Sequence, residues 1–161
     1  MSPTPAGPYL PTTALVAVAW LGQRVPGLTD AMVATSLPRD LTTWADAGFV
    51  QVTIIPGGVE VDSGGRRRGL AQIDAWGINL KADGSAEARP AVNKATRLAE
   101  LVRRATEDDV QVFGRPVTLP ENYLDARVLA AYPQTEPAPI PGDPSGFGRV
   151  TFDLALDWVR L

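Results

Sequence analysis

The sequence predicts an α+β fold: a mostly antiparallel sheet with two helices packed on one face, plus a hairpin and long loops. Two segments, residues 12–24 and 90–105, have the composition and spacing of helices. Several others alternate apolar and polar residues with the period of two that is typical of strands. The order is helix, strands, hairpin, helix, strands, so short turns join consecutive strands and favour antiparallel pairing.

Length and composition limit the possible chemistry. The chain has 161 residues, enough to bury the core of one compact domain. Hydrophobic residues make up 45% and charged residues 20%, a globular balance that argues against disorder of the whole chain. The sequence contains no Cys and no His. It therefore lacks disulfides, thiol nucleophiles, metal sites built from these residues and the usual neutral-pH proton shuttle.

Charge and hydropathy argue against a nucleic-acid-binding protein and against a membrane or secreted protein. The formal net charge is −3 and the isoelectric point about 4.9, so we expect no general attraction to nucleic acid. The longest apolar run, residues 14–22, is shorter than the roughly 20 residues that span a bilayer. Residues 1–13 contain no Lys or Arg and so lack the basic start of a signal peptide. We expect a protein that is made and assembled in the cytoplasm, with no membrane partner.

The first helix follows a proline-rich arm. Residues 1–11 hold four prolines, which predicts an extended arm in front of one domain formed by residues 12–161. Thr12 or Thr13 can cap a helix that runs to about Arg24. Apolar side chains cover nearly the whole circumference of this helix, so its own sheet or a neighbour should bury it.

Strands and a hairpin come next. We expect a short strand at residues 31–35, a helical turn at 40–46 and a strand at 50–55 that ends before Pro56. The segments on either side of a glycine- and arginine-rich stretch then form a hairpin. The predicted tip of the hairpin contains three adjacent arginines, Arg66, Arg67 and Arg68.

The second helix is the clearest pattern in the chain. Pro90 suits its first helical position. Glu100 and Arg104 are spaced for an ion pair along its polar face. The apolar stripe that should pack on the sheet consists of Ala91, Ala95, Leu98, Val102 and Ala105.

The chain ends in strands. Residues 124–134 predict one strand and residues 135–146 a proline-rich loop. The last segment, residues 147–161, alternates with a period of two, and its polar face includes Asp153 and Asp157. The face that should be covered holds Val150, Phe152, Leu154, Leu156 and Trp158.

The arginine-rich tip has three interpretations. A phosphate cradle requires a Lys-Ser/Thr pair between a strand and a helix, and this stretch has neither feature. The tip is otherwise a solvated turn or, as we slightly favour, a loop that orders against a partner. In that case Arg66, Arg67 and Arg68 pair with carboxylates of a neighbouring subunit or protein, or touch DNA without sequence preference.

Acidic and hydroxyl residues give no catalytic arrangement. Glu107, Asp108 and Asp109 are contiguous, so they do not face one another across a cleft. The serines in glycine-rich loops lack both a nucleophile elbow and a histidine. Asp74, on the strand after the hairpin, is a satisfied carboxylate at the edge of the core, which we favour, or an interface residue. We expect no catalytic, cofactor-binding or metal site.

Two consecutive segments resemble a known family. GLAQIDAWG, at residues 69–77, is followed by ARPAVNKATRLAELVRRA at 88–105. Together they resemble the tail terminator proteins of long-tailed bacteriophages, especially those that infect high-GC actinobacteria. In that family a strand with an apolar-Asp-apolar-Trp pattern, here Ile73 to Trp76, leads into an amphipathic helix. The last strand also fits the family order, whereas the proline-rich arm departs from it.

The resemblance implies a structural virion protein and not an enzyme. Subunits of this family close into a hexameric ring that caps the tail tube protein and ends tube polymerisation. The ring joins the tail to a head-completion or stopper protein at the neck, and genomic DNA passes through its lumen without sequence recognition. No cofactor is involved. Under this interpretation Arg66, Arg67, Arg68 and Asp74 are protein-interface residues.

Other functions remain open. Another head–tail neck protein, such as an adaptor, stopper or completion protein, is also small and non-catalytic. Adaptors are more helical, however, and stoppers lean towards small β-barrels. A small α+β enzyme or ligand-binding domain would need a pocket with a perturbed carboxylate. A ring subunit of a transport or secretion system would have a similar build.

Overall fold

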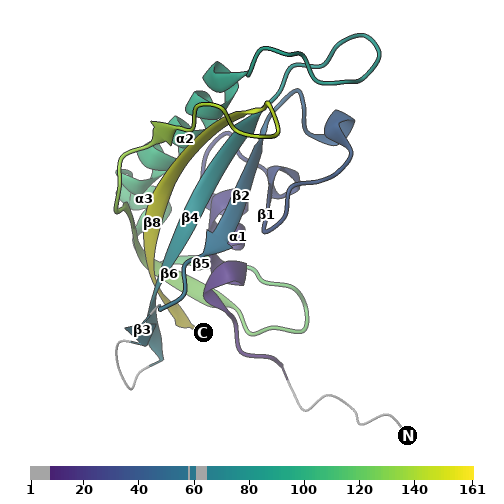
Figure 1. The fold of residues 1–161 in the computed structure, drawn as a ribbon. Helices are drawn as coiled ribbons and strands as arrows, with labels where there is room; N and C mark the ends of the chain where they lie inside the picture. Colours follow the sequence, from purple (N-terminus) through teal and green to yellow (C-terminus); the bar gives the residue numbers. More distant parts are fainter. Residues whose placement is uncertain (1–7, 58, 61–64) are drawn as a thin grey trace, which may run out of the picture.

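The computed structural model describes residues 8–57, 59–60 and 65–161. One sheet of eight strands runs through it, in the order β1-β2-β4-β8-β6-β5, while β3 pairs with β4 and β7 with β8 (Figure 1). The pairing of β1 with β2 is parallel and the others are antiparallel, so the predicted α+β fold is confirmed with a mixed sheet. The strands are β1 (Val33–Ala34), β2 (Phe49–Ile54), β3 (Val59–Glu60), β4 (Arg66–Gly77), β5 (Arg115–Val117), β6 (Ala126–Pro133), β7 (Ala138–Pro139) and β8 (Gly148–Arg160).

Two long strands form the centre of the sheet. β4 and β8 pair from Arg66 opposite Val159 to Gly77 opposite Gly148. The other edge of β4 is lined by β2 and then β3, with Pro56 between them. The other edge of β8 is lined in the same way by β6 and then β7. Each central strand therefore has two shorter strands along its outer edge.

The two longer helices lie on one face of this sheet, as predicted (Figure 1). Trp20, Leu98 and Val102 pack with the alternating apolar residues of β8 in one core. The helices are α1 (Thr13–Arg24), α2 (Val92–Thr106) and the short α3 (Asp109–Val112), with 3-10 turns η1 (Asp30–Met32) and η2 (Leu41–Thr43). The apolar residues predicted for the covered face of the last strand are all buried.

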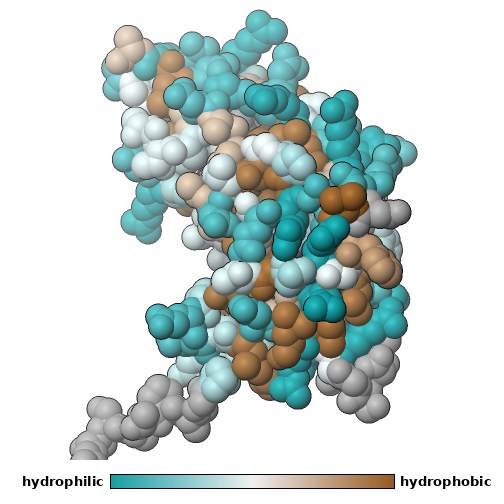
Figure 2. All heavy atoms as spheres, turned by 180° about the vertical axis from the view of Figure 1, so that it is seen from behind, coloured by the Kyte–Doolittle hydropathy of each residue, from teal (hydrophilic) through white to brown (hydrophobic). Residues whose placement is uncertain are grey.

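The apolar circumference of α1 is covered only in part. Val16, Trp20 and Leu21 are buried against the sheet, whereas Leu15 and Val18 stay partly exposed. Seen from the helix face, apolar side chains reach the surface among polar ones (Figure 2). Among the described residues, the sheet and the neighbouring η1 therefore cover α1 only in part. Burial of the remaining apolar side chains by a neighbouring protein stays a prediction.

The starts of the two helices differ. Thr12 caps α1, and its hydroxyl oxygen accepts a hydrogen bond from the N–H of Leu15 at 3.3 Å. The prediction that Pro90 begins the second helix is wrong. α2 begins at Val92, after Ala91, whose backbone is not helical and whose side chain gives no cap.

Glycines allow both helices to approach the sheet closely. A Cβ atom on Gly77 would lie 2.5 Å from the carbonyl oxygen of Ala91, and one on Gly148 would lie 2.5 Å from the carbonyl carbon of Ala91. Gly69 has the same role under α1, because a Cβ atom there would collide with the side chain of Thr13. Contact between Ala91 and the sheet therefore determines where α2 can begin, which explains the delay past the proline.

Prolines mark the outer edge on the β6 side of the sheet. Pro116 lies in β5, Pro133 ends β6 and Pro139 lies in β7. A proline has no N–H to offer an added strand, and prolines are typical of edges guarded against further pairing. We infer that contacts with other chains on this side would use side chains more than backbone pairing.

The end of the proline-rich arm is attached to the rest of the chain. The N–H of Tyr9 donates to the carbonyl oxygen of Asn122 at 2.7 Å. The N–H of Leu124 donates to the carbonyl oxygen of Tyr9 at 3.0 Å. The rings of Tyr9 and Tyr123 lie 5.5 Å apart. Residues 1–7 of the predicted arm lie outside the described part of the chain.

Replacing Gly148 by Ala tests the close approach of α2. The added methyl group would collide with backbone atoms of Ala91 and Val92, which no change of rotamer relieves. We expect the free energy of unfolding to fall by about 1–3 kcal/mol in urea titrations followed by circular dichroism. The control Thr151→Ala, on the opposite face of the same strand, should stay within about 0.5 kcal/mol of the parent. A Gly148→Ala variant as stable as the parent would refute the close contact.

Candidate functional site

The polar side chains of the sheet gather on the face opposite the helices, here called the outer face. Residues directly opposite one another on β4 and β8 point to the same face. The outer face therefore holds the pairs Arg68 with Asp157, Gln72 with Asp153, Asp74 with Thr151, and Trp76 with Arg149. Charged residues form two clusters, one towards each end of the β4–β8 ribbon.

The first cluster joins two arginines to one carboxylate. The Nε of Arg68 lies 2.8 Å from Oδ1 of Asp157, and an Nη2 from each of Arg66 and Arg68 lies 3.2 Å from Oδ2. The side chain of Asp157 is only 5% exposed, whereas those of Arg66 and Arg68 are 42% and 49% exposed. The carboxylate is thus the buried member, and both arginines reach over it from the surface.

These contacts shift the pKa values of the cluster. The hydrogen bond from Arg68 holds the pKa of Asp157 below its usual value, with a smaller effect of Arg66, and burial opposes both. The same hydrogen bond raises the pKa of Arg68. Both shifts favour the charged forms, so the cluster is an ion pair at neutral pH.

The prediction that the three arginines sit at a hairpin tip is wrong. Arg66, Arg67 and Arg68 begin β4, and the tip, residues 61–64, lies outside the described residues. Alternation along the strand turns Arg67 to the helix side, where its guanidinium lies 5.8 Å from the centre of the Trp158 ring. The three residues therefore do not form one cationic patch.

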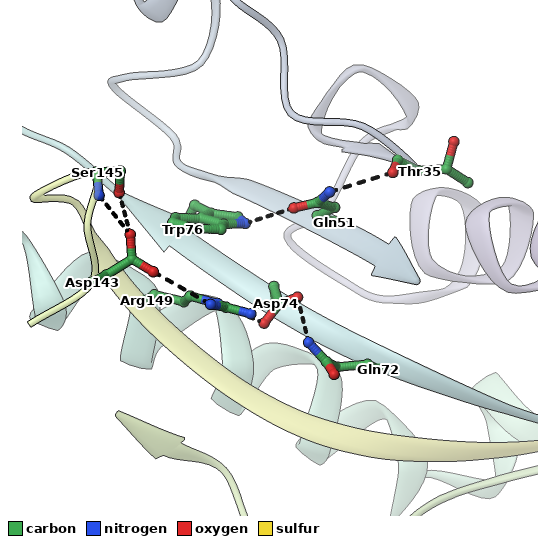
Figure 3. A network of polar contacts seen from close by, with 8 residues as sticks. All are labelled: Thr35, Gln51, Gln72, Asp74, Trp76, Asp143, Ser145 and Arg149. Carbon is green, nitrogen blue, oxygen red and sulfur yellow. Dashed lines mark hydrogen bonds and ion pairs between the residues drawn. The ribbon is translucent and has the colours of Figure 1, made fainter. Parts of the chain in front are cut away.

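Asp74 is the centre of the second cluster (Figure 3). Its Oδ1 accepts from Nε of Arg149 and its Oδ2 from Nε2 of Gln72, each at 2.9 Å. Arg149 also contacts Oδ2 of Asp143 at 3.3 Å, and Asp143 accepts from the backbone and hydroxyl of Ser145. Asp74 is 3% exposed and satisfied within the chain, in agreement with the favoured interpretation. A contact with a partner stays a prediction for this residue.

The pKa values in the second cluster also favour the charged forms. The hydrogen bond to Asp74 raises the pKa of Arg149, although partial burial opposes the rise. Hydrogen bonds from Ser145 hold the pKa of Asp143 below its usual value, with a smaller effect of Arg149. The loop that contains Asp143 is thereby tied to β8.

Aromatic side chains, first among them Trp76, pack beside the second cluster. The guanidinium of Arg149 lies 5.1 Å from the centre of the Trp76 ring, and the indole N–H of Trp76 donates to Oε1 of Gln51 at 3.1 Å. Gln51 in turn donates to the carbonyl oxygen of Thr35 at 3.4 Å (Figure 3). Trp76 packs in a second small core with Trp44, Phe49, Ala45 and Ile78, against which Phe147 rests. This core attaches the loops around residues 35–48 and 140–147 to the outer face.

A groove of about 510 Å³ lies beside α1. Its apolar lining includes Leu15, Val18 and Leu119, and its polar lining includes Gln23. Both polar ends of Gln23 are bonded to the backbone of Thr118, at 2.8 and 2.9 Å. Asp30 also lines the groove, so a mostly apolar surface has one carboxylate at its edge.

The acidic run after α2 does not converge on a site. Asp108 accepts from the N–H of Val110 at 2.9 Å, and Glu107 is exposed. The side chain of Asp109 lies outside the described part of the structure. Among the acidic side chains that are described, no three lie close enough to hold a metal ion. Within residues 8–57, 59–60 and 65–161, no helix is both long and apolar enough to cross a membrane.

Comparison with protein-family models and with curated proteins found no match to this chain.

Replacing the two arginines that contact Asp157 should destabilise the fold more than replacing Asp157 itself. Arg66→Ala/Arg68→Ala leaves a buried carboxylate without a partner, whereas Asp157→Asn leaves two arginines that water can solvate. We expect the double alanine variant to have the lower urea midpoint at pH 7. Equal midpoints for the two variants would contradict the assignment of Asp157 as the buried member.

Acid titration tests the pKa of Asp157. A carboxylate with a lowered folded-state pKa stabilises the fold above its unfolded value of about 3.9, and this stabilisation is lost as pH falls through the folded value. We expect Asp157→Asn to be less stable than the parent at pH 7 and the difference to shrink below pH of about 4. Urea midpoints between pH 2 and 7 measure this, with Asp153→Asn on the same strand face as the control. A difference that is constant with pH would exclude the ion pair as its cause.

Proposed function

We propose that this chain is a non-catalytic subunit of a ring, hexameric by resemblance, that ends a bacteriophage tail tube. In this role it stops tube polymerisation and joins the tail to a head-completion or stopper protein. Genomic DNA passes through the lumen without sequence recognition. The protein assembles in the host cytoplasm and then resides at the neck of the virion.

The observation that most supports the proposal is the packing of the two segments on which the resemblance rests. α2 lies against β4 and β8, and its start contacts Gly77, the last residue of GLAQIDAWG. Within that motif Ile73 lies in the core, Asp74 binds Arg149 and Trp76 anchors the second core. These three positions of the pattern therefore contribute to packing or to an ion pair. A pattern shared among structural proteins is expected to serve the fold in this way.

The charged residues of the outer face also support a scaffold role. The acids with the clearest pKa shifts there, Asp143 and Asp157, are held in their ionised forms by arginines and by a serine. General acid–base catalysis instead uses groups whose pKa values are moved towards the working pH. The two clusters fix the register of β4 and β8 and the position of the loop before β8.

Electron microscopy of self-assembling tail tube protein tests the proposed function. Purified tube protein from a long-tailed actinobacteriophage is polymerised with and without the folded chain and examined in negative stain. We expect short tubes with an additional ring at one end, because a bound ring blocks the addition of further tube subunits. The acid-unfolded chain serves as the control.

Unaltered tube length with no additional ring would remove the terminator proposal. The adaptor, stopper and completion proteins of the neck would then be the functions to test, by binding to the connector end instead of the tube end.

A further inference from the structure

We propose that a second copy of this chain docks on the helix face, with an apolar knob of one copy in a basic groove of the other. The knob consists of Glu107, Val110 and Phe113, at the C-terminal end of α2 and around α3. The groove consists of Pro26, Arg97, Leu101 and Arg104, between α2 and the turn after α1. This contact concerns the chain alone and does not require the proposed tail function.

The knob presents apolar side chains with little cover. Phe113 is 77% exposed and Val110 60% exposed, the largest exposures among the big apolar residues of the described chain. Glu107 is exposed beside them and has no ion pair among the described residues. Two large apolar side chains three residues apart, both more than half exposed, form a small apolar surface that a partner could bury.

The groove has the opposite charge around an apolar floor. Two hollows of about 200 and 190 Å³ adjoin along α2 and share Leu101 and Arg104. Pro26, Ala105 and Asp108 also line one hollow, and Arg97 and Glu100 also line the other. Arg97, Leu101 and Arg104 are four and three residues apart, so they follow one side of the helix.

Two cations of this groove have no ion pair in the described part of the chain. The sequence spacing predicts that Glu100 pairs with Arg104, but Glu100 pairs with Arg103 instead, at 3.4 Å. Among the described residues Arg97 and Arg104 have no ion pair, and both are exposed. Asp108 also lines the groove, and its Oδ1 accepts a hydrogen bond from the N–H of Val110 at 2.9 Å. The rim therefore offers two arginines to an incoming acid.

Size and charge together favour a second copy as the occupant. Each hollow, at about 200 or 190 Å³, has room for a protruding side chain. An apolar side chain accompanied by an acid would match it, and this chain presents such a group in its own knob. The groove follows α2, whereas the knob lies after it, around α3. The two surfaces are separate, so each copy can offer both a knob and a groove.

Disulfide trapping tests the contact, because the chain has no Cys and introduced thiols stand alone. Val110→Cys places a thiol at the knob, and Glu100→Cys places one at the groove, where the side chain of Glu100 is 45% exposed. The two folded variants, one of them isotope-labelled, are mixed and oxidised. We expect a mixed disulfide between them and none between Glu100→Cys and the control Lys81→Cys, which lies in an exposed loop.

Second-site changes separate docking from chance collision. Phe113→Asp in the knob variant should abolish the mixed disulfide, and so should Arg97→Glu/Arg104→Glu in the groove variant. Adding Glu107→Arg to the knob variant should restore the product with the charge-reversed groove. The proposal is overturned if the mixed disulfide does not exceed the Lys81→Cys control, or if Phe113→Asp leaves it unchanged.

The pattern of products also separates this inference from the proposed function. A chain with both Val110→Cys and Glu100→Cys would give dimers alone if a two-fold axis relates the copies, and a ladder of larger products if they form a ring. Both patterns support the contact. Dimers alone would count against the ring in the proposed function, while leaving the knob and groove in place.

Discussion

The register between β4 and β8 determines where almost every charged group of the sheet can act. It places Arg68 opposite Asp157 and Trp76 opposite Arg149 on one face, while Ile73 and Phe152 face each other in the core. A slip by one residue would move the polar set into the core and the apolar set to the surface. Both ion-pair clusters and both cores therefore depend on this one pairing, and the glycines under α2 keep the helix in contact with it.

The two buried carboxylates of the β4–β8 pair make other registers of this pair less stable. Asp74 and Asp157 are 3% and 4% exposed, and each is bound by an arginine that remains partly in water. A buried acid without its cation is far less stable than a surface arginine without its acid. Alternative registers would separate these partners, so the clusters select against them in addition to the hydrophobic pattern.

Much of the fold follows from sequence patterns, and the errors have local causes. The alternation of the last strand and the apolar stripe of the second helix identify both elements, because each pattern is long. The arginine stretch after Gly65 has the composition of a loop, because a run of like charges shows no apolar–polar alternation. The carboxylate that pairs with Arg68, that of Asp157, is 89 residues away in the sequence. A period-two comparison of Arg66 and Arg68 with the last strand could have found the pair. The short strands β5 and β7 are too brief for any periodicity, and Pro90 misleads because the contact of Ala91 with the sheet is a tertiary constraint.

The two faces of the molecule differ in what they can offer to another protein. On the outer face, each charge of the two clusters already has an ion-pair partner inside the chain, with two arginines on Asp157 and two carboxylates on Arg149. Pairing these groups with another protein would first weaken existing contacts. On the helix face, Arg97, Arg104 and Glu107 have no ion pair among the described residues and lie close to exposed apolar surface. New ion pairs there would replace only water contacts, and apolar burial would add to them. Prolines mark the outer strand edge on the β6 side, which disfavours backbone pairing there, so the helix face is the surface on which the proposed contact between copies is placed.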